Sequence, residues 1–89
     1  MVWRVEWEDE AIKELQKLDP RAQRTIVRYL RDKIATDQDP RRFGDPLRKD
    51  LKGLWKYRIG AYRIICSIED NNLVVLVVRV GHRRYVYGK

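Results

Sequence analysis

The segment 54–64, Leu-Trp-Lys-Tyr-Arg-Ile-Gly-Ala-Tyr-Arg-Ile, most constrains the fold, because it predicts two strands joined by a tight turn. A type II′ turn prefers glycine at its first central position, so Gly60-Ala61 is expected to form that turn. This register places Arg58 directly opposite Arg63. Like charges that face each other destabilise a sheet, so the pair indicates an anion that binds between them.

Period-two alternation sorts the side chains of the two strands into two faces. One face is apolar and is expected to pack under helices; it carries Trp55, Tyr57, Ile59, Tyr62, Ile64, Cys66 and Ile68. The other face carries Lys56 and Arg58, opposed by Ile65 and Arg63, so that three cations gather there. A register shift of one residue would scatter the cations, so this prediction depends on the turn.

Upstream of the hairpin, the pattern predicts one strand and two helices. Val2–Trp7 alternates as a half-buried strand does, and Glu8–Glu10 supplies acids suited to the first turn of a helix. Asp19-Pro20 is a typical helix start, an N-cap followed by proline. The apolar residues at helical spacing are Ala11, Ile12, Leu15 and Leu18 in the first helix, and Ala22, Ile26, Leu30 and Ile34 in the second.

The rest of the chain predicts a loop and a small sheet. Residues 37–50 hold two prolines and a glycine and are expected to form the loop. Strands are expected at 54–59, 62–69 and 73–80, and Gly81 is expected to let the chain bend away from the sheet. The order β-α-α-β-β-β predicts an α+β domain, with a helical hairpin packed on a largely antiparallel four-stranded sheet.

Composition limits the class of protein. The 89 residues make one domain, 1–89, and 37% of them are charged, which implies a highly solvated surface. Cys66 is the single cysteine, which excludes an internal disulfide and fits a reducing cytoplasm, the expected location. We find no signal peptide and no apolar run near the roughly 18 residues of a membrane span, so no membrane partner is expected.

The net charge of +7 is unevenly distributed. Residues 1–40 hold 8 Lys/Arg against 9 Asp/Glu, and residues 41–89 hold 12 against 4, so the halves carry −1 and +8. Such asymmetry is typical of a nucleic-acid or phosphate partner, although a solubilising excess of charge would look the same. The positive half also contains a tail with more cations and phenols: His82, Arg83, Arg84, Tyr85 and Tyr87.

The available chemistry favours a metal-free reaction. One histidine and one cysteine make a metal centre improbable, so no metal or other cofactor is expected. Cys66 falls in the middle of a strand on the apolar face and is interpreted as packing. RNA carries its own nucleophile, the 2′-OH, and fixed arginines and lysines can stabilise the charge that develops at phosphorus. A phenol among cations favours its phenolate form and could act as the base.

The whole chain resembles the RelE toxins of type II toxin–antitoxin systems, within the RelE/ParE superfamily. The resemblance is carried by the opening strand, an Ala-x-x-x-Leu-x-x-Leu helix, the segment 51–64 and the motif Val-Gly-His-Arg-Arg-x-Val-Tyr at 80–87. It implies a RelE-like fold of the microbial ribonuclease type. It also implies a ribosome-dependent endoribonuclease that cuts mRNA in the A site of the 30S subunit by 2′-OH attack and so inhibits translation.

The resemblance implies roles for individual residues. Lys56, Arg58 and Arg63 would bind and stabilise the phosphate, Arg83 would stabilise charge or donate a proton, and Tyr87 would be the general base or a stacking platform. The segment after Gly81 is shorter than in the best-known RelE proteins, so Tyr85 competes for the base role. His82 would share proton transfer or stack. Further cations expected to contact RNA or the ribosome are Lys52, Arg84 and Lys89.

Two alternatives stay open beside the nuclease. One is a ParE-like toxin that acts on DNA gyrase and cuts nothing, and the other is a non-catalytic RNA- or ribosome-binding module. The resemblance further implies a cognate antitoxin with an acidic or amphipathic segment that masks the basic face, and a complex that contacts operator DNA through the antitoxin. The apolar surface of the helical hairpin and the sheet edge are the expected docking sites for it.

Overall fold

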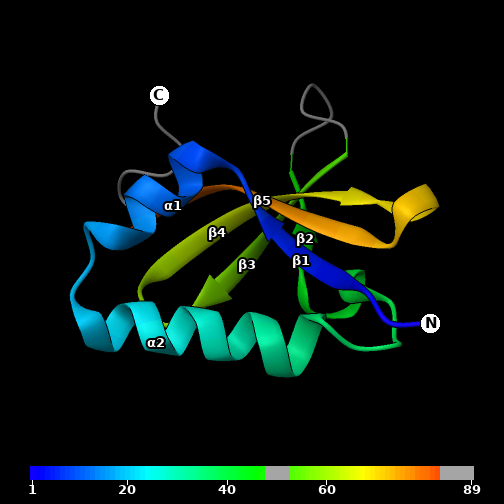
Figure 1. Cartoon of the computed structure of the whole chain (residues 1–89), viewed down its shortest axis with the longest axis horizontal. Helices are drawn as coiled ribbons and strands as arrows, with labels where there is room; N and C mark the ends of the chain where they lie inside the picture. The colour runs from blue at the N-terminus through cyan, green and yellow to red at the C-terminus, as the bar shows by residue number, and fades with distance from the viewer. Residues whose placement is uncertain (48–52, 83–89) are drawn as a thin grey trace.

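A computed structural model describes residues 1–47 and 53–82 of the chain as helices packed against one mixed sheet (Figure 1). The strands are β1 (Arg4–Trp7), β2 (Asp45–Pro46), β3 (Leu54–Ile59), β4 (Tyr62–Glu69) and β5 (Val74–His82). The helices are α1 (Asp9–Gln16) and α2 (Pro20–Tyr29), with a π-helical turn η1 (Leu30–Ile34) and 3-10 turns η2 (Pro40–Phe43) and η4 (Asp70–Asn72).

The sheet has the order β1-β5-β4-β3-β2, with β1 parallel to β5 and the other neighbours antiparallel. The α+β class and the element order are therefore confirmed, but the expected count of four strands is wrong. The fifth strand, β2, lies inside the predicted loop and pairs only Asp45 with Lys56 and Pro46 with Trp55. A pairing this short has no periodicity to detect, and proline is tolerated there because β2 is an edge strand.

The register of the β3–β4 hairpin is the one predicted from its turn. Ile59 pairs with Tyr62 and Arg58 with Arg63. Gly60 has a φ of 62° and Ala61 has no positive φ, which is the pattern of a type II′ turn. Glycine is needed here because a side chain at positive φ would be strained.

The two helices begin as their sequences predict. The Asp19 carboxylate accepts a hydrogen bond of 2.7 Å from the Ala22 N–H, and Pro20 occupies the first turn of α2. At its other end α2 continues as the wider turn η1, where the Ala35 N–H donates to the Leu30 carbonyl at 2.8 Å. Ile34 is fully buried at the end of this turn, so the apolar stripe of the helix reaches the core throughout.

The core lies between α2 with η1 and one face of the sheet. Ile26, Leu30 and Ile34 belong to the same buried cluster as Tyr57 and Ile64, and α2 runs along this side of the sheet (Figure 1). The other buried sheet residues of the cluster are Ile59, Cys66, Ile68, Val75, Val77 and Val80. The predicted apolar face is therefore confirmed, and the cations alternate to the opposite side.

The strand β5 is longer than expected, and this changes the place of Gly81. The strand runs to His82, and Gly81 is paired with Arg63, so the expected bend at Gly81 is wrong. The ladder with β4 holds Gly81 and His82 in the sheet, and glycine has enough conformational freedom for extended backbone too. Within residues 1–47 and 53–82, no helix is long and apolar enough to cross a membrane.

Past Trp7, where β1 ends, the Glu14 side chain of α1 bonds to the edge of β5. Glu14 accepts a hydrogen bond of 2.7 Å from the Val80 N–H and one of 3.0 Å from Arg79 Nε. Its carboxylate thus satisfies a backbone donor that a neighbouring strand would otherwise pair. This contact holds the last part of β5 close to α1.

The buried phenol of Tyr57 gives a test of the core. Its hydroxyl donates a 2.7 Å hydrogen bond to the Pro40 carbonyl and fixes η2 over β3. We expect Tyr57→Phe to lower the free energy of unfolding by about 1–2 kcal/mol, because a buried carbonyl loses its partner. Urea denaturation would measure this. Tyr62→Phe is the matched control; an equal loss there would contradict the assignment.

Candidate active site

The face of the sheet opposite the helices gathers four cations, Lys56, Arg58, Arg63 and Arg79, which we call the cationic face. The β3–β4 ladder pairs Arg58 with Arg63 and Lys56 with Ile65. The β4–β5 ladder pairs Ile65 with Arg79 and Arg63 with Gly81. Since paired residues point to the same side of a sheet, the four cations share one face around the buried Ile65.

Arg79 is the member of this face that sequence reasoning missed. Its position depends on an irregularity, since Ile65 pairs with Arg79 but the next residue, Cys66, pairs with Val77. One residue of β5 is therefore left without a partner, as in a β-bulge. The bulge changes which face of the sheet the residues after it occupy, so alternation counted from the start of β5 does not place Arg79 on the cationic face.

Arg58 and Arg63 face each other without a carboxylate between them. Arg58 is exposed and makes no hydrogen bond or ion pair with any residue that the structure describes. Arg63 Nη1 donates to backbone carbonyls of the turn, at 3.1 Å to Tyr62 and 3.4 Å to Gly60. Two guanidinium groups with no anion partner are a ready site for a phosphate, which binds arginine more strongly than a carbonyl does.

Two of the four cations of the cationic face, Lys56 and Arg79, have an acid beside them, and Arg58 and Arg63 do not. The β2–β3 ladder places Asp45 beside Lys56, and Glu14 pairs with Arg79 at 3.0 Å. By contrast, the register partners of Arg58 and Arg63 in the described strands are each other and Gly81. The least compensated positive charge therefore lies at the turn end of the hairpin.

His82 lies on the other face of the sheet. It pairs with Tyr62, and the two rings meet edge to face with centroids 6.0 Å apart. The structure therefore brings Lys56, Arg58 and Arg63 together as predicted but points His82 away from them. Of the two roles left open for His82, this contact supports packing against a ring, whereas proton transfer stays a prediction.

The remaining predicted site residues lie outside the described part of the chain. They are Lys52, Arg83, Arg84, Tyr85, Tyr87 and Lys89. The last described residue, His82, is the end of β5 beside the hairpin turn. Arg83 follows it directly in the sequence.

The described residues give little support to a cysteine nucleophile, to a reactive Tyr57 phenol or to a metal site. Cys66 is fully buried, and burial raises the pKa of its thiol, so it is a poor nucleophile. Burial likewise raises the pKa of the Tyr57 phenol, which already donates to Pro40. Residues 1–47 and 53–82 contain no group of three His, Cys, Asp or Glu side chains that could hold a metal ion.

Comparison with known proteins gives consistent matches. The sequence profile of the family described as the ParE toxin of type II toxin–antitoxin system, parDE, matches residues 5–87. Toxin RelG of Mycobacterium tuberculosis is 33% identical over 89 residues, which is 100% of both chains. Among solved structures, the toxin–antitoxin complex RelBE2 of the same organism contains a chain that superposes with a TM-score of 0.84 at 32% identity, covering 93% of each chain.

A more distant structural relative supports the same fold. The archaeal RelE–RelB complex from Pyrococcus horikoshii contains a chain that superposes with a TM-score of 0.71 at 26% identity. That match covers 97% of this chain and 100% of the other. The similarity therefore extends over the whole domain.

The arginine pair predicts an unusual effect on stability. We expect Arg58→Glu to raise the free energy of unfolding by about 0.5–1 kcal/mol at low salt, because an ion pair with Arg63 replaces a repulsion. Urea denaturation at low and high salt would measure this, and screening should shrink the gain. The double variant Arg58→Glu/Arg63→Glu restores like charges and should lose it. If the effects of Arg58→Glu and Arg63→Glu on the free energy of unfolding simply add in the double variant, the two side chains do not interact. That result would contradict their pairing in the structure.

Proposed function

The chain belongs to the RelE/ParE toxin family of type II toxin–antitoxin systems, and from this membership we propose that it is a ribosome-dependent mRNA endoribonuclease. The cut is made in the ribosomal A site by attack of the RNA 2′-OH on the adjacent phosphorus. The observation that carries this proposal is that Arg58 and Arg63 face each other on the side of the sheet opposite the helices, and that neither bonds to a carboxylate among the described residues. Cleavage arrests translation.

The cationic face suits the charge changes of this reaction. As the 2′-oxygen attacks, negative charge builds on the non-bridging oxygens of the phosphate, and the 5′-oxygen leaves. Arg58 and Arg63 face each other from neighbouring strands, so one phosphate can accept hydrogen bonds from both. The two guanidinium groups already lie together before the substrate binds. Little rearrangement of them is therefore needed when negative charge develops on the phosphate.

The proton transfers are assigned to the tail. In this proposal Tyr87 takes the proton of the 2′-OH, and Arg83 donates to the leaving oxygen or stabilises its charge. Tyr85 is the competing base. Lys56 and Arg79 extend the surface for neighbouring phosphates, with Arg79 first leaving Glu14. The product ends in a 2′,3′-cyclic phosphate, and no metal takes part.

The partners follow from the same proposal. They are the 30S A site with its mRNA, and a cognate antitoxin that neutralises the toxin. The related chains belong to the toxin–antitoxin complex RelBE2 and to the RelE–RelB complex of Pyrococcus horikoshii, which supports an equivalent partner here. Contact with operator DNA is assigned to the antitoxin in the complex.

A ParE-like activity is the second candidate, because the family profile that matches is described as the ParE toxin. Such a toxin would inhibit DNA gyrase and would need no phosphate site. The cationic face favours the nuclease, since gyrase inhibition gives no reason for two arginines to face each other. A supercoiling assay run beside the cleavage assay separates the two.

Cleavage of a defined mRNA on programmed ribosomes tests the main proposal. We expect the wild-type chain to cut only when ribosomes are present, and Arg58→Ala or Arg63→Ala to lower the cleavage rate by about 10²- to 10³-fold. The control variant, Lys17→Ala, changes an exposed cation just after α1 and should cut normally. Gyrase inhibition without any cleavage would replace the nuclease with the second candidate.

The same assay distinguishes the tail phenols. We expect Tyr87→Phe to lower the rate by about 10²- to 10⁴-fold, as loss of a general base does, and to flatten the alkaline limb of the pH–rate profile. Tyr85→Phe should retain most activity. The reverse result would assign the base to Tyr85, and normal rates for both variants would remove tyrosine from the mechanism.

A further inference from the structure

Glu14 bonds to the cationic face through Arg79, and the proposed reaction gives this carboxylate no role of its own. One of its oxygens, Oε1, accepts a hydrogen bond of 2.7 Å from the Val80 N–H. The other, Oε2, accepts one of 3.0 Å from Arg79 Nε. Because the two bonds use different oxygens, the bond to Arg79 can break while the bond to Val80 stays.

The two bonds of Glu14 differ in how easily a ligand can replace them. A backbone N–H at the edge of a sheet is costly to leave without a partner, so the bond to Val80 is the firm one. The ion pair is the weaker one, because the Arg79 side chain is 47% exposed and pairs in contact with water contribute little. Apart from Nε, the Arg79 guanidinium makes no hydrogen bond with any described residue, so both Nη groups are available to an anion.

The sheet places Arg79 one step away from the facing arginines Arg58 and Arg63. The step is set on β4, where Arg63 pairs with Arg58 and Ile65, two residues further on, pairs with Arg79. Two residues along a strand span about 7 Å, which is close to the separation of neighbouring phosphates in an RNA strand. An RNA with one phosphate between Arg58 and Arg63 therefore has a neighbouring phosphate at the level of Arg79.

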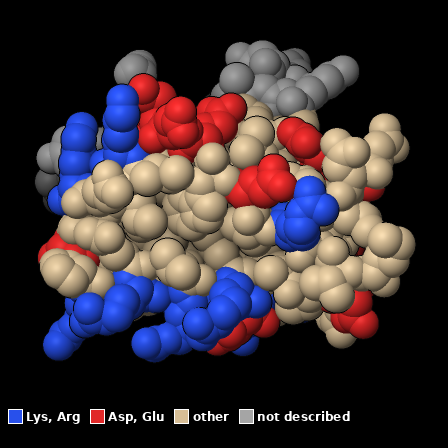
Figure 2. Space-filling model, viewed as in Figure 1, with Lys and Arg blue, Asp and Glu red and all other residues tan. Residues whose placement is uncertain are grey.

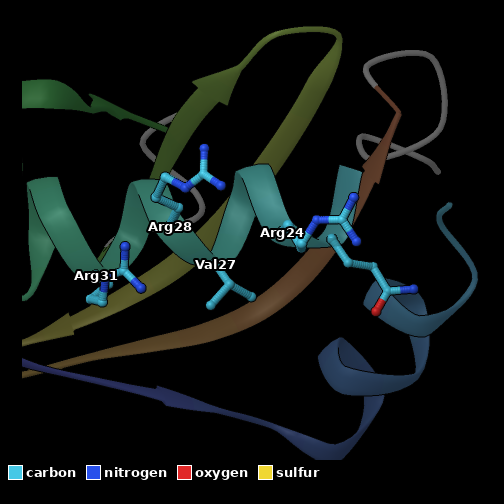
Figure 3. Close-up of a pocket in the computed structure, with 5 residues that line it drawn as sticks. Arg24, Val27, Arg28 and Arg31 are labelled. Atoms are coloured by element: carbon cyan, nitrogen blue, oxygen red, sulfur yellow. The ribbon is translucent and has the colours of Figure 1, made fainter. Parts of the chain in front are cut away.

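The cations of α2 provide a comparison, because they lie on the side of the sheet that carries the core. Arg24 and Arg28 line a hollow of about 350 Å³, which Figure 3 shows together with Val27. An adjoining hollow of about 230 Å³ reaches Trp7 of β1. Lys and Arg side chains gather along the lower side of the molecule, where α2 runs (Figures 1 and 2). No described carboxylate lines either hollow, so the arrangement at Arg79 is not repeated there.

We propose that Arg79 binds the phosphate next to the one that is cleaved, and that Glu14 is the counter-ion that Arg79 exchanges for this phosphate. The inference rests on the proposed function, since the phosphate belongs to RNA. In the unbound chain the ion pair holds the Arg79 guanidinium. When RNA binds, a phosphate oxygen replaces Oε2 as the acceptor, and Oε1 keeps the Val80 N–H bonded. The released carboxylate oxygen stays near the phosphate, so Glu14 lowers the affinity for RNA without disturbing β5.

The probe is a single-stranded RNA with methylated 2′-hydroxyls, which cannot be cut, titrated against the full chain at low salt. In Glu14→Gln the amide oxygen can still accept from the Val80 N–H, but the charge is gone. We expect this variant to bind the RNA about 3- to 5-fold more tightly than wild type. Arg79→Gln should bind about 10-fold more weakly, because a charged hydrogen bond to phosphate is lost. The double variant Glu14→Gln/Arg79→Gln should bind like Arg79→Gln.

Two matched variants separate the exchange from a general change of charge. Glu10→Gln removes an acid of α1 that is paired with Lys13 at 3.7 Å, and its affinity should stay near that of wild type. Arg28→Gln removes a cation of α2 and should weaken binding far less than Arg79→Gln does. A gain in Glu14→Gln that persists in the Arg79→Gln background, or an equal gain in Glu10→Gln, would overturn the exchange.

NMR of the wild-type chain tests the exchange without any variant. On addition of the RNA, the Arg79 Nε–H resonance should shift, while the Val80 amide should keep its slow hydrogen exchange. Glu14→Ala, which removes both acceptors, should speed exchange at Val80, whereas Glu14→Gln should not. An Arg79 resonance that ignores bound RNA, or a Val80 amide that loses protection when RNA binds, would contradict the inference.

Ribosomal cleavage by the same chains keeps this inference and the proposed function apart. Glu14→Gln and Arg79→Gln should change KM rather than kcat, since the exchange affects binding. Coupled effects on RNA affinity in a wild-type chain that never cuts support the exchange and remove the nuclease. Cleavage by a wild-type chain whose RNA affinity equals that of Glu14→Gln retains the nuclease and overturns the exchange. No binding of the RNA by wild type and Glu14→Gln at low salt overturns it as well.

Discussion

The hydrogen-bonded register of the β3–β4 hairpin is the constraint on which the rest of the structure depends. It starts at Gly60, whose positive φ allows a two-residue turn, and it continues through six paired positions to Leu54 and Ser67. Because side chains alternate, this single register sends Tyr57 and Ile64 toward α2 and sends Arg58 and Arg63 to the open side. Core and cationic face are therefore two consequences of one turn.

The strand β5 extends this arrangement and joins it to α1. The irregular pairing between Ile65 and Cys66 brings Arg79 onto the cationic face. Glu14 then bonds both Arg79 and the Val80 N–H, which ties the helix to the end of the strand. The segment that leads into the tail is thus fixed from two sides, by the ladder with β4 and by a carboxylate from α1.

Like charges lie next to each other twice in the described residues, once across the hairpin, at Arg58 and Arg63, and once along α2, at Arg24 and Arg28. In each place two arginines lie at positions where like charges cost stability. A ligand with negative charge relieves that cost, so the arrangement stores part of the binding energy in the unbound chain. The two places differ in their surroundings, since Val27 and Trp7 are among the residues that line the hollows beside α2, whereas Arg58 and Arg63 flank the turn of the β3–β4 hairpin.

Local chemistry explains how much could be predicted from the sequence. The turn at Gly60, the cap at Asp19 with Pro20, and the alternation from Trp55 to Ile68 are short-range signals, and each gave the correct element and register. The strand β2, the length of β5, the position of Arg79 and the face of His82 depend on partners distant in sequence. A two-residue edge pairing and a bulge leave no periodicity, so only tertiary packing decides them.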